Sequence, residues 1–231
     1  MSGYVVLAII ILAGIIQASL QLGTGCLLLL YKGSLEQSTK KKSKKLAKHY
    51  IIGYAFYTAL MLMAAAFSVS SLIGRLSIMA NTIVALILCG VAVLMWFFYN
   101  KFGYSTELWL PKSVKRYMNK SAKTTKSKIE AFSLGNLSCF AEMPFSLFLY
   151  LLTANCILYL NGQTQMFAVM LFIVLSISPL LLVDASIKTG KNLADIQKWR
   201  LKNIGFIKAA SGVGFVILAL FVIAFCCMGV A

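Results

Sequence analysis

The sequence predicts an all-α, polytopic membrane protein with six transmembrane helices, and two observations support that fold class. Of the 231 residues, 60 % are hydrophobic, and the mean hydropathy is +0.86, too apolar for a water-soluble domain of this size. The apolar residues also form stretches of about twenty or more, the length of a spanning helix, whereas membrane β-barrels use alternating segments of about ten. The predicted spans are 4–31, 50–74, 77–100, 131–160, 166–184 and 204–230.

The basic residues predict how these spans are oriented. All 22 lysines and arginines except Arg75 fall at 32–48, 101–128 and 188–208, which are the first, third and fifth connections. The fourth connection, 161–165, carries no charge. Because short basic loops stay on the cytoplasmic side, this alternation places both termini on the extracytoplasmic side.

The lysine-rich connections predict the partners and the location of the protein. We expect them to fix the topology and to attract anionic headgroups of membrane lipids, with no nucleic-acid partner despite a net charge of +16. The run 40–45 has the composition of a flexible linker. Tyr31 and Tyr50 lie at span ends, where aromatic residues are typical interfacial anchors. A plasma membrane, in particular a bacterial inner membrane, is the expected location.

Glu142 is the most informative residue, because it lies in the middle of the fourth predicted span. An acid at that depth costs about 2.5–3.5 kcal/mol, so it usually faces a polar cavity or a partner. Pro144 follows two residues later and removes a backbone hydrogen bond. Since ion-coupled carriers place their sites at interrupted helices, this segment predicts a binding site.

The order of spans and loops also predicts two halves. Residues 1–100 form the first three-helix half, 101–130 a basic cytoplasmic linker, and 131–231 the second half. Three spans per half make the halves enter the membrane in opposite directions, as in an inverted-topology repeat. The glycine-containing runs 22–26 and 134–139 are similar between the first spans of each half.

This architecture, together with the segments 131–135 and 141–145 that follow Trp109-Leu110-Pro111, resembles the lysine-exporter (LysE) superfamily. The similarity is greatest to its GAP/Sap-like and cadmium-resistance members and more distant to the DsbD/CcdA thiol-electron carriers. In place of the proline-rich motif of the amino-acid exporters, the first half has Gly23-Thr24-Gly25. The resemblance implies a multi-pass secondary transporter that exports its solute.

Polar residues of the first and fourth spans form the predicted substrate and ion site. Gln17, Gln21 and Thr24 recur at the i, i+4, i+7 spacing of one helix face. If the two spans pack together, this face meets the polar residues of the fourth span, and the opposing halves rock around Glu142. The predicted site residues are Glu142, Gln17, Gln21, Thr24, Asn136 and Ser138, and the predicted helix breaks lie at Gly23, Gly25, Pro144 and Pro179.

Three alternatives remain open on these residues. Cys26 and Cys139 occupy comparable places in the two halves, as the reactive pair of a CcdA-like thiol–disulfide carrier would, although neither follows a proline. A protonated Glu142 that hydrogen-bonds a neighbouring helix would serve packing alone. A non-transporting membrane assembly factor would depend on the lysines of 40–45 instead. We expect no enzymatic activity, cofactor or metal, and a homodimer is one assembly that the sequence leaves open.

Asp184 is a second acidic residue near the membrane, at the cytoplasmic end of the fifth predicted span. Lys188 follows it four residues later, the spacing that brings two side chains together on a helix. We expect a simple interfacial ion pair between them.

Overall fold

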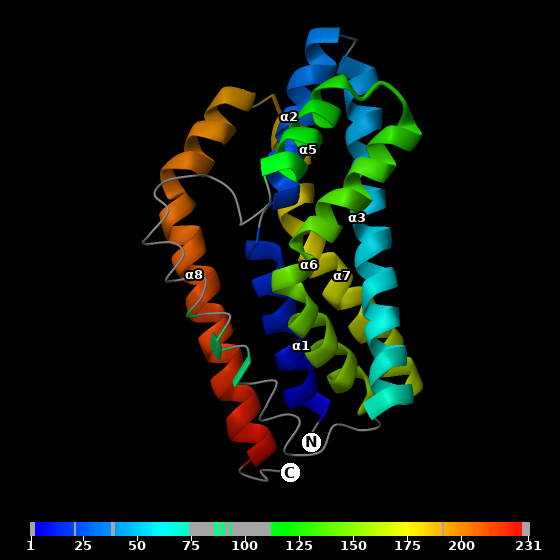
Figure 1. The fold of residues 1–231 in the computed structure, drawn as a ribbon, viewed down its shortest axis with the longest axis vertical. Coiled ribbons are helices and arrows are strands. Elements are labelled where there is room, and N and C mark those ends of the chain that lie inside the picture. Colours follow the sequence, from blue (N-terminus) through cyan, green and yellow to red (C-terminus); the bar gives the residue numbers. More distant parts are fainter. Residues whose placement is uncertain are drawn as a thin grey trace.

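The computed structural model describes residues 3–20, 22–37, 40–73, 86–87, 89–90, 93, 112–190 and 192–227. Every regular element within these ranges is a helix, and the helices run side by side in a bundle (Figure 1). The elements are α1 (Gly3–Ser19), α2 (Leu22–Gln37), α3 (Lys40–Ser68), the π-helical turn η1 (Val69–Ile73), α5 (Lys112–Thr124), α6 (Lys128–Leu158), α7 (Gly162–Lys188) and α8 (Leu193–Cys227).

The described residues agree with a multi-pass membrane protein. Four described helices are long and apolar enough to cross a bilayer, and a fifth span is present if α1 and α2, which bend by 44° at their junction, are counted as one. The third predicted span, 77–100, lies outside the described residues apart from 86–87, 89–90 and 93. The start of α1 and the end of α8 lie at one end of the bundle, opposite the end where α2 meets α3 (Figure 1).

The first span is broken between α1 and α2, close to the predicted glycines. Ser19 Oγ donates to the Ile16 carbonyl at 2.6 Å, and the Leu20 amide donates to the Gln17 carbonyl at 3.3 Å. Such short-range bonds compete with the regular i to i−4 pattern and end the helix here. Gly23 and Gly25 therefore lie in the first turns of α2, just after the break.

The predicted breaks at Pro144 and Pro179 are wrong in the described structure, since α6 and α7 continue through both residues. A proline removes only one helical hydrogen bond, and membrane helices tolerate it where another group satisfies the freed carbonyl. At Pro179 that carbonyl belongs to Leu175, and Ser178 Oγ donates to it at 2.7 Å. The second half thus keeps continuous helices where the first half has a break.

Helices α3 and α6 form the most extensive helix pair, and α1 and α7 the next. Glycines bring the backbones of α3 and α6 into contact: a Cβ added at Gly53 would lie 2.2 Å from the Phe132 carbonyl oxygen, and one at Gly135 would lie 2.2 Å from that of Tyr50. Small residues allow this close approach, which is the usual basis of helix association in lipid. The pair fixes the position of α6 relative to α3.

The lysine run 40–45 is not a flexible linker, because it forms the first turns of α3. Ser43, Leu46, Ala47 and Tyr50 are buried, although the lysines around them carry charge. Their i, i+3, i+4, i+7 spacing is that of an amphipathic helix. The number of lysines alone therefore does not predict this helix, because only a few residues form its buried face.

The predicted linker 101–130 also contains a helix, α5. Met118 and Ala122 lie one turn apart on its buried face, and α5 packs mainly on α2. The two helices approach closely at Gly33, where a Cβ would be 2.5 Å from the Lys123 carbonyl oxygen. Ser127 and Glu130 then form a capping box that begins α6.

Candidate functional site

Glu142 lies at the centre of the site and is 0 % exposed. Its carboxylate accepts hydrogen bonds from at least three donors, which come from three different helices. The Gly23 amide of α2 donates to Oε1 at 3.0 Å, while the Tyr54 hydroxyl of α3 and Gln17 Nε2 of α1 lie 2.6 and 3.5 Å from Oε2. The break in the first span, α3 and α6 therefore meet at one buried carboxylate.

The Gly23 donor belongs to the N-terminus of α2. The first four amides of a helix have no partner within the helix, and the helix dipole adds positive potential at that end. A carboxylate is a suitable partner for both reasons. Glu142 thus occupies the anion-binding position that the break in the first span creates.

Gly23 is also required by the packing around the carboxylate. A Cβ at this position would lie 2.9 Å from Tyr54 Cε2, too close without a shift of the ring. The absence of a side chain lets the Tyr54 ring lie against α2 while its hydroxyl reaches Glu142. The glycine predicted to break the helix serves instead to admit a tyrosine.

Tyr50 and Tyr54 belong to the candidate site, although the sequence did not predict them as site residues. Tyr50 is fully buried, and its hydroxyl donates to the Gly23 carbonyl at 2.8 Å, so its expected role as an interfacial anchor is wrong. One turn later, Tyr54 donates to Glu142. The i, i+4 spacing of two tyrosines within a span was a signal for a shared polar face.

Gln17 has a buried acceptor that no group in the described part of the chain satisfies. The residue is 1 % exposed, its Nε2 faces Glu142, and its Oε1 has no hydrogen-bond partner among the described residues. A buried carbonyl oxygen without a partner carries a desolvation cost of about 1–3 kcal/mol. The oxygen is therefore a place where a donor or a cation would bind favourably next to the carboxylate.

The other predicted site residues have different positions. Thr24 is buried on α2, and Gln21 lies outside the described residues. Ser138 Oγ donates to the Leu134 carbonyl of its own helix at 2.9 Å, and Asn136 Oδ1 is buried without a partner among the described residues. The described hydrogen bonds of Glu142 bring together Gln17 and Gly23 but do not include Asn136 or Ser138.

Two cysteines lie in the same buried cluster as these tyrosines. Cys26 and Cys139 are both buried there, and neither forms a disulfide within the described part of the chain. Cys139 Sγ lies 3.4 Å from Thr58 Oγ1 and 3.6 Å from the Tyr150 hydroxyl. The Cys139 thiol thus has two hydroxyl neighbours, one from α3 and one from its own helix.

Arg200 of α8 places a positive charge next to α2. A Cβ added at Gly25 would lie 2.8 Å from Arg200 Nη1, so the guanidinium packs directly on the backbone of α2. Arg200 precedes the apolar stretch Gly205–Ala224 of α8 by one to two turns. Sequence reasoning counted it only as part of a basic loop.

Asp184 holds the other part of α2. Its carboxylate accepts from Lys188 Nζ, which confirms the expected ion pair, and also from the Tyr31 hydroxyl of α2. Tyr31 is 1 % exposed, so it is a buried partner and not the interfacial anchor expected from its position. Two carboxylates, Glu142 and Asp184, therefore contact α2 near its start and about two turns farther along.

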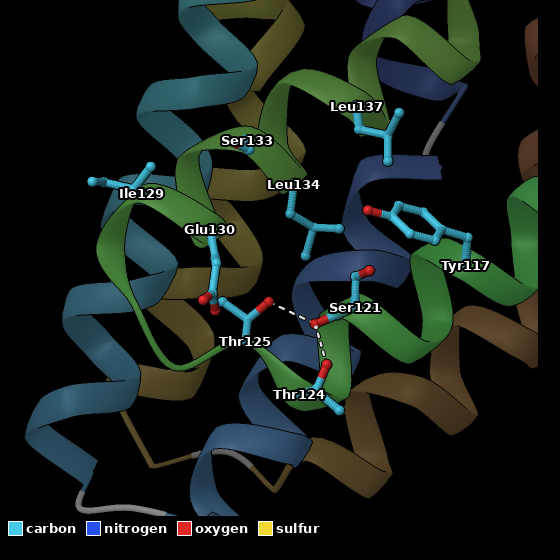
Figure 2. Close-up of a pocket in the computed structure, with 9 residues that line it drawn as sticks. All are labelled: Tyr117, Ser121, Thr124, Thr125, Ile129, Glu130, Ser133, Leu134 and Leu137. Carbon is cyan, nitrogen blue, oxygen red and sulfur yellow. Dashed lines mark hydrogen bonds between the residues drawn. The ribbon is translucent and has the colours of Figure 1, made fainter.

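A separate pocket of about 260 Å³ lies between α5 and the beginning of α6, away from Glu142 (Figure 2). Hydroxyl groups line one end of it and leucines the other. The residues around it are Tyr117, Ser121, Thr124, Thr125, Ile129, Glu130, Ser133, Leu134 and Leu137.

The chain matches no protein-family model, no curated protein and no solved structure. The fold and the site define it as a helical, multi-pass membrane protein with a buried carboxylate at a broken span.

Proposed function

We propose that this protein is a secondary membrane transporter, an exporter of a small or amphipathic solute, in which Glu142 couples transport to a proton or another cation. The observation that carries the proposal is the contact between this fully buried carboxylate and the amide of Gly23, at the break in the first span. Carriers bind their ions where membrane helices are interrupted. The resemblance to the LysE superfamily points to the same class and direction of transport.

The helix contacts support a pair of inverted repeats. In an inverted repeat, span one corresponds to span four, and span two corresponds to span five. The contact between α3 and α6, which are spans two and four, therefore corresponds to the contact between α7 and α1, which are spans five and one. These are the two most extensive helix pairs among the described residues. Two equivalent interfaces of this kind suit a rocking motion of one half against the other.

The mechanism proposed for coupling acts on α2. An ionised Glu142 attracts the α2 amide end, and its oxygens accept from Gly23 and Tyr54. Addition of a proton to one oxygen removes the charge and one acceptor, so the attraction to the helix end weakens. The half-helix can then separate from α6 and open the site to one side of the membrane. Release of the proton restores the attraction.

The unpartnered oxygen of Gln17 suggests how a solute or cation takes part. It lies on the same amide that faces Glu142, so a donor or cation bound there would interact with both groups. Binding would satisfy the buried oxygen and compete with a proton for the carboxylate. This competition is the thermodynamic link that an exchanger needs.

Titratable groups of α3 and α6 interact electrostatically with Glu142. They are Tyr50, Tyr54, Cys139 and Tyr150. Cys26 of α2 lies in the same buried cluster as Tyr50, and Arg200 of α8 packs on α2 at Gly25.

The proposal is tested by a solute screen in proteoliposomes that contain a fluorescent pH indicator. Lysine, cadmium ion and the amphipathic cation tetraphenylphosphonium represent an amino acid, a metal cation and an amphipathic solute. Wild-type protein should give proton movement with one class, and Glu142→Gln should lose it. Glu130→Gln is the matched control, because Glu130 lies on the same helix and is exposed. Glutamine can replace glutamate in the capping box at the start of α6. Equal proton movement by Glu142→Gln and wild type would overturn the proposal.

The thiol–disulfide carrier is the second candidate, since Cys26 and Cys139 share one buried cluster near Glu142. Such a carrier would transfer two electrons by forming and reducing a disulfide between the two sulfurs. Replacement of both cysteines by serine separates the two functions. If Glu142 drives transport, solute-linked proton movement should survive the double replacement. If the two thiols drive transport, the movement should be lost.

A further inference from the structure

The pocket between α5 and α6 points to a second binding site, at the level of the membrane interface. Its lining runs from Thr124 and Thr125 at the end of α5 to Leu137 on α6. Residues 129–137 span roughly 12 Å along a helix. Because α6 enters the predicted bilayer from Lys128, this length covers the headgroup layer and the beginning of the hydrocarbon core.

The two ends of the pocket differ in chemistry. Ser121, Thr124, Thr125 and Glu130 gather at the end nearest the α5–α6 turn, and Leu134 and Leu137 lie with Tyr117 at the other end (Figure 2). A polar end toward the predicted cytoplasm and an apolar end toward the lipid match the two parts of a phospholipid. At about 260 Å³ the pocket is slightly smaller than most sites for whole small molecules, and a headgroup is a suitable size.

The hydrogen-bonding groups favour an uncharged, hydroxyl-bearing headgroup. Thr124 and Thr125 donate to backbone carbonyls of α5, so their oxygens remain able to accept. The Glu130 carboxylate accepts from the Lys126 and Ser127 amides, and a phosphate placed beside it would be repelled. Ser133 and Tyr117 have hydroxyls that can donate or accept. This mixture of groups suits a diol better than an anion.

The charged side chains around the pocket indicate which group of a lipid would lie at its rim. Lys120, Lys126 and Lys128 are exposed and next to lining residues in the chain. They attract a phosphate at the rim and repel an ammonium group. The combination of a phosphate outside and a neutral polyol inside describes a phosphatidylglycerol-type lipid.

We propose that the α5–α6 pocket binds the headgroup of one phosphatidylglycerol molecule of the inner leaflet. The glycerol of the headgroup lies among the hydroxyls, the phosphate lies at the lysine rim, and the acyl chains follow Leu134 and Leu137 into the bilayer. The site is independent of Glu142, so it holds whether or not the proposed transport function does.

Native mass spectrometry of the full chain tests this site, after equilibration with mixed micelles of equal phosphatidylglycerol and phosphatidylserine content. Both lipids carry one net negative charge, so charge alone gives equal retention. We expect one phosphatidylglycerol to be retained about fivefold more strongly than phosphatidylserine, the effect of roughly one hydrogen bond. Equal retention of the two lipids would overturn the proposal.

Variants locate the binding. Ser133→Leu should fill the pocket and remove the preference, while Ser70→Leu, at an exposed serine of η1, should keep it. Tyr117→Ala, which removes an exposed wall of the pocket, should also reduce the preference without affecting the core. Lys126→Gln with Lys128→Gln should weaken retention of both anionic lipids equally. A preference that survives both Ser133→Leu and Tyr117→Ala would place the lipid elsewhere and contradict the proposal.

Discussion

Helix α2 is held by two carboxylates whose surroundings differ. Glu142 lies at its amino-terminal end and is 0 % exposed, and the donors described for it are uncharged: an amide N–H, a phenol and a side-chain amide. Asp184 contacts α2 through Tyr31 and is paired with the ammonium of Lys188, whose side chain is 45 % exposed. One acid is enclosed, and the other reaches the interface.

This difference indicates which carboxylate can sense a proton or cation. Lys188 supplies a full positive charge to Asp184, so the pair is already neutral. The donors described for Glu142 are dipolar, and an added proton or cation would change the electrostatic attraction between this carboxylate and α2. The proposed coupling therefore concerns Glu142, whereas the described contacts of Asp184 are those of an ion pair and a hydrogen bond to Tyr31.

The largest effect is expected from Glu142→Ala, compared with Asp184→Ala. The first change leaves the Gly23 amide and the Tyr54 hydroxyl buried without an acceptor, at a cost of about 1–3 kcal/mol for each group. Thermal unfolding in detergent should show a clearly larger loss for Glu142→Ala than for Asp184→Ala. A larger loss at Asp184 would reverse the comparison between the two acids.

A smaller loss is expected from Gly23→Ala. The added methyl group would meet the Tyr54 ring at 2.9 Å and displace it from the carboxylate, and such overpacking costs about 1–3 kcal/mol. Transport and thermal stability should both fall. Gly162→Ala is the control, because a Cβ there has open space around it. If the two variants behave alike, the close contact between α2 and Tyr54 is not present.

Tyr54→Phe removes one hydroxyl and leaves the ring in place. Loss of a hydrogen bond to a charged group should lower stability by about 1.5–3 kcal/mol when Glu142 is ionised and less when it is protonated. The difference between wild type and variant should therefore shrink as the pH falls. Tyr57→Phe, on the same helix and outside the described hydrogen bonds of Glu142, should show no such pH dependence.

The smallest effect is expected from Lys188→Gln. A half-exposed ion pair contributes about 0–1 kcal/mol, and salt screens it further. The stability of the variant should lie close to that of wild type, and the small difference should decrease at high ionic strength. A loss as large as that of Tyr54→Phe would show that the ion pair stabilises the fold as much as the buried hydrogen bond to Glu142 does, and would contradict this ranking.

The sequence pointed to Glu142 and Gly23, the two residues in contact at the centre of this site, but not to the other groups around them. An acid in an apolar span must find partners, which pointed to Glu142, and glycines with amides in the first span pointed to Gly23 and Gln17. Tyr54 was missed because a tyrosine in a span is equally compatible with packing. Only the contact of α3 with α6, which depends on the close approach of Gly53 to Phe132 and of Gly135 to Tyr50, shows that the Tyr54 hydroxyl reaches the carboxylate.

The helix break shows a related limit. Proline and glycine both signal interruption, yet the described structure interrupts the first span and continues through Pro144 and Pro179. At Pro179 the outcome depended on Ser178, which donates to the freed Leu175 carbonyl. Whether a helix breaks depends on which neighbour satisfies the backbone, and a sequence pattern does not specify that neighbour.

The proposed role of Glu142 is tested by measuring solute-linked proton movement by wild type and Glu142→Gln in the same proteoliposomes over a range of external pH. Wild-type proton movement should vary with pH, and Glu142→Gln should reduce it roughly 10- to 100-fold, the effect of removing a charged hydrogen-bonding group. A glutamine variant that moves protons with solute as wild type does, at every pH, would contradict it.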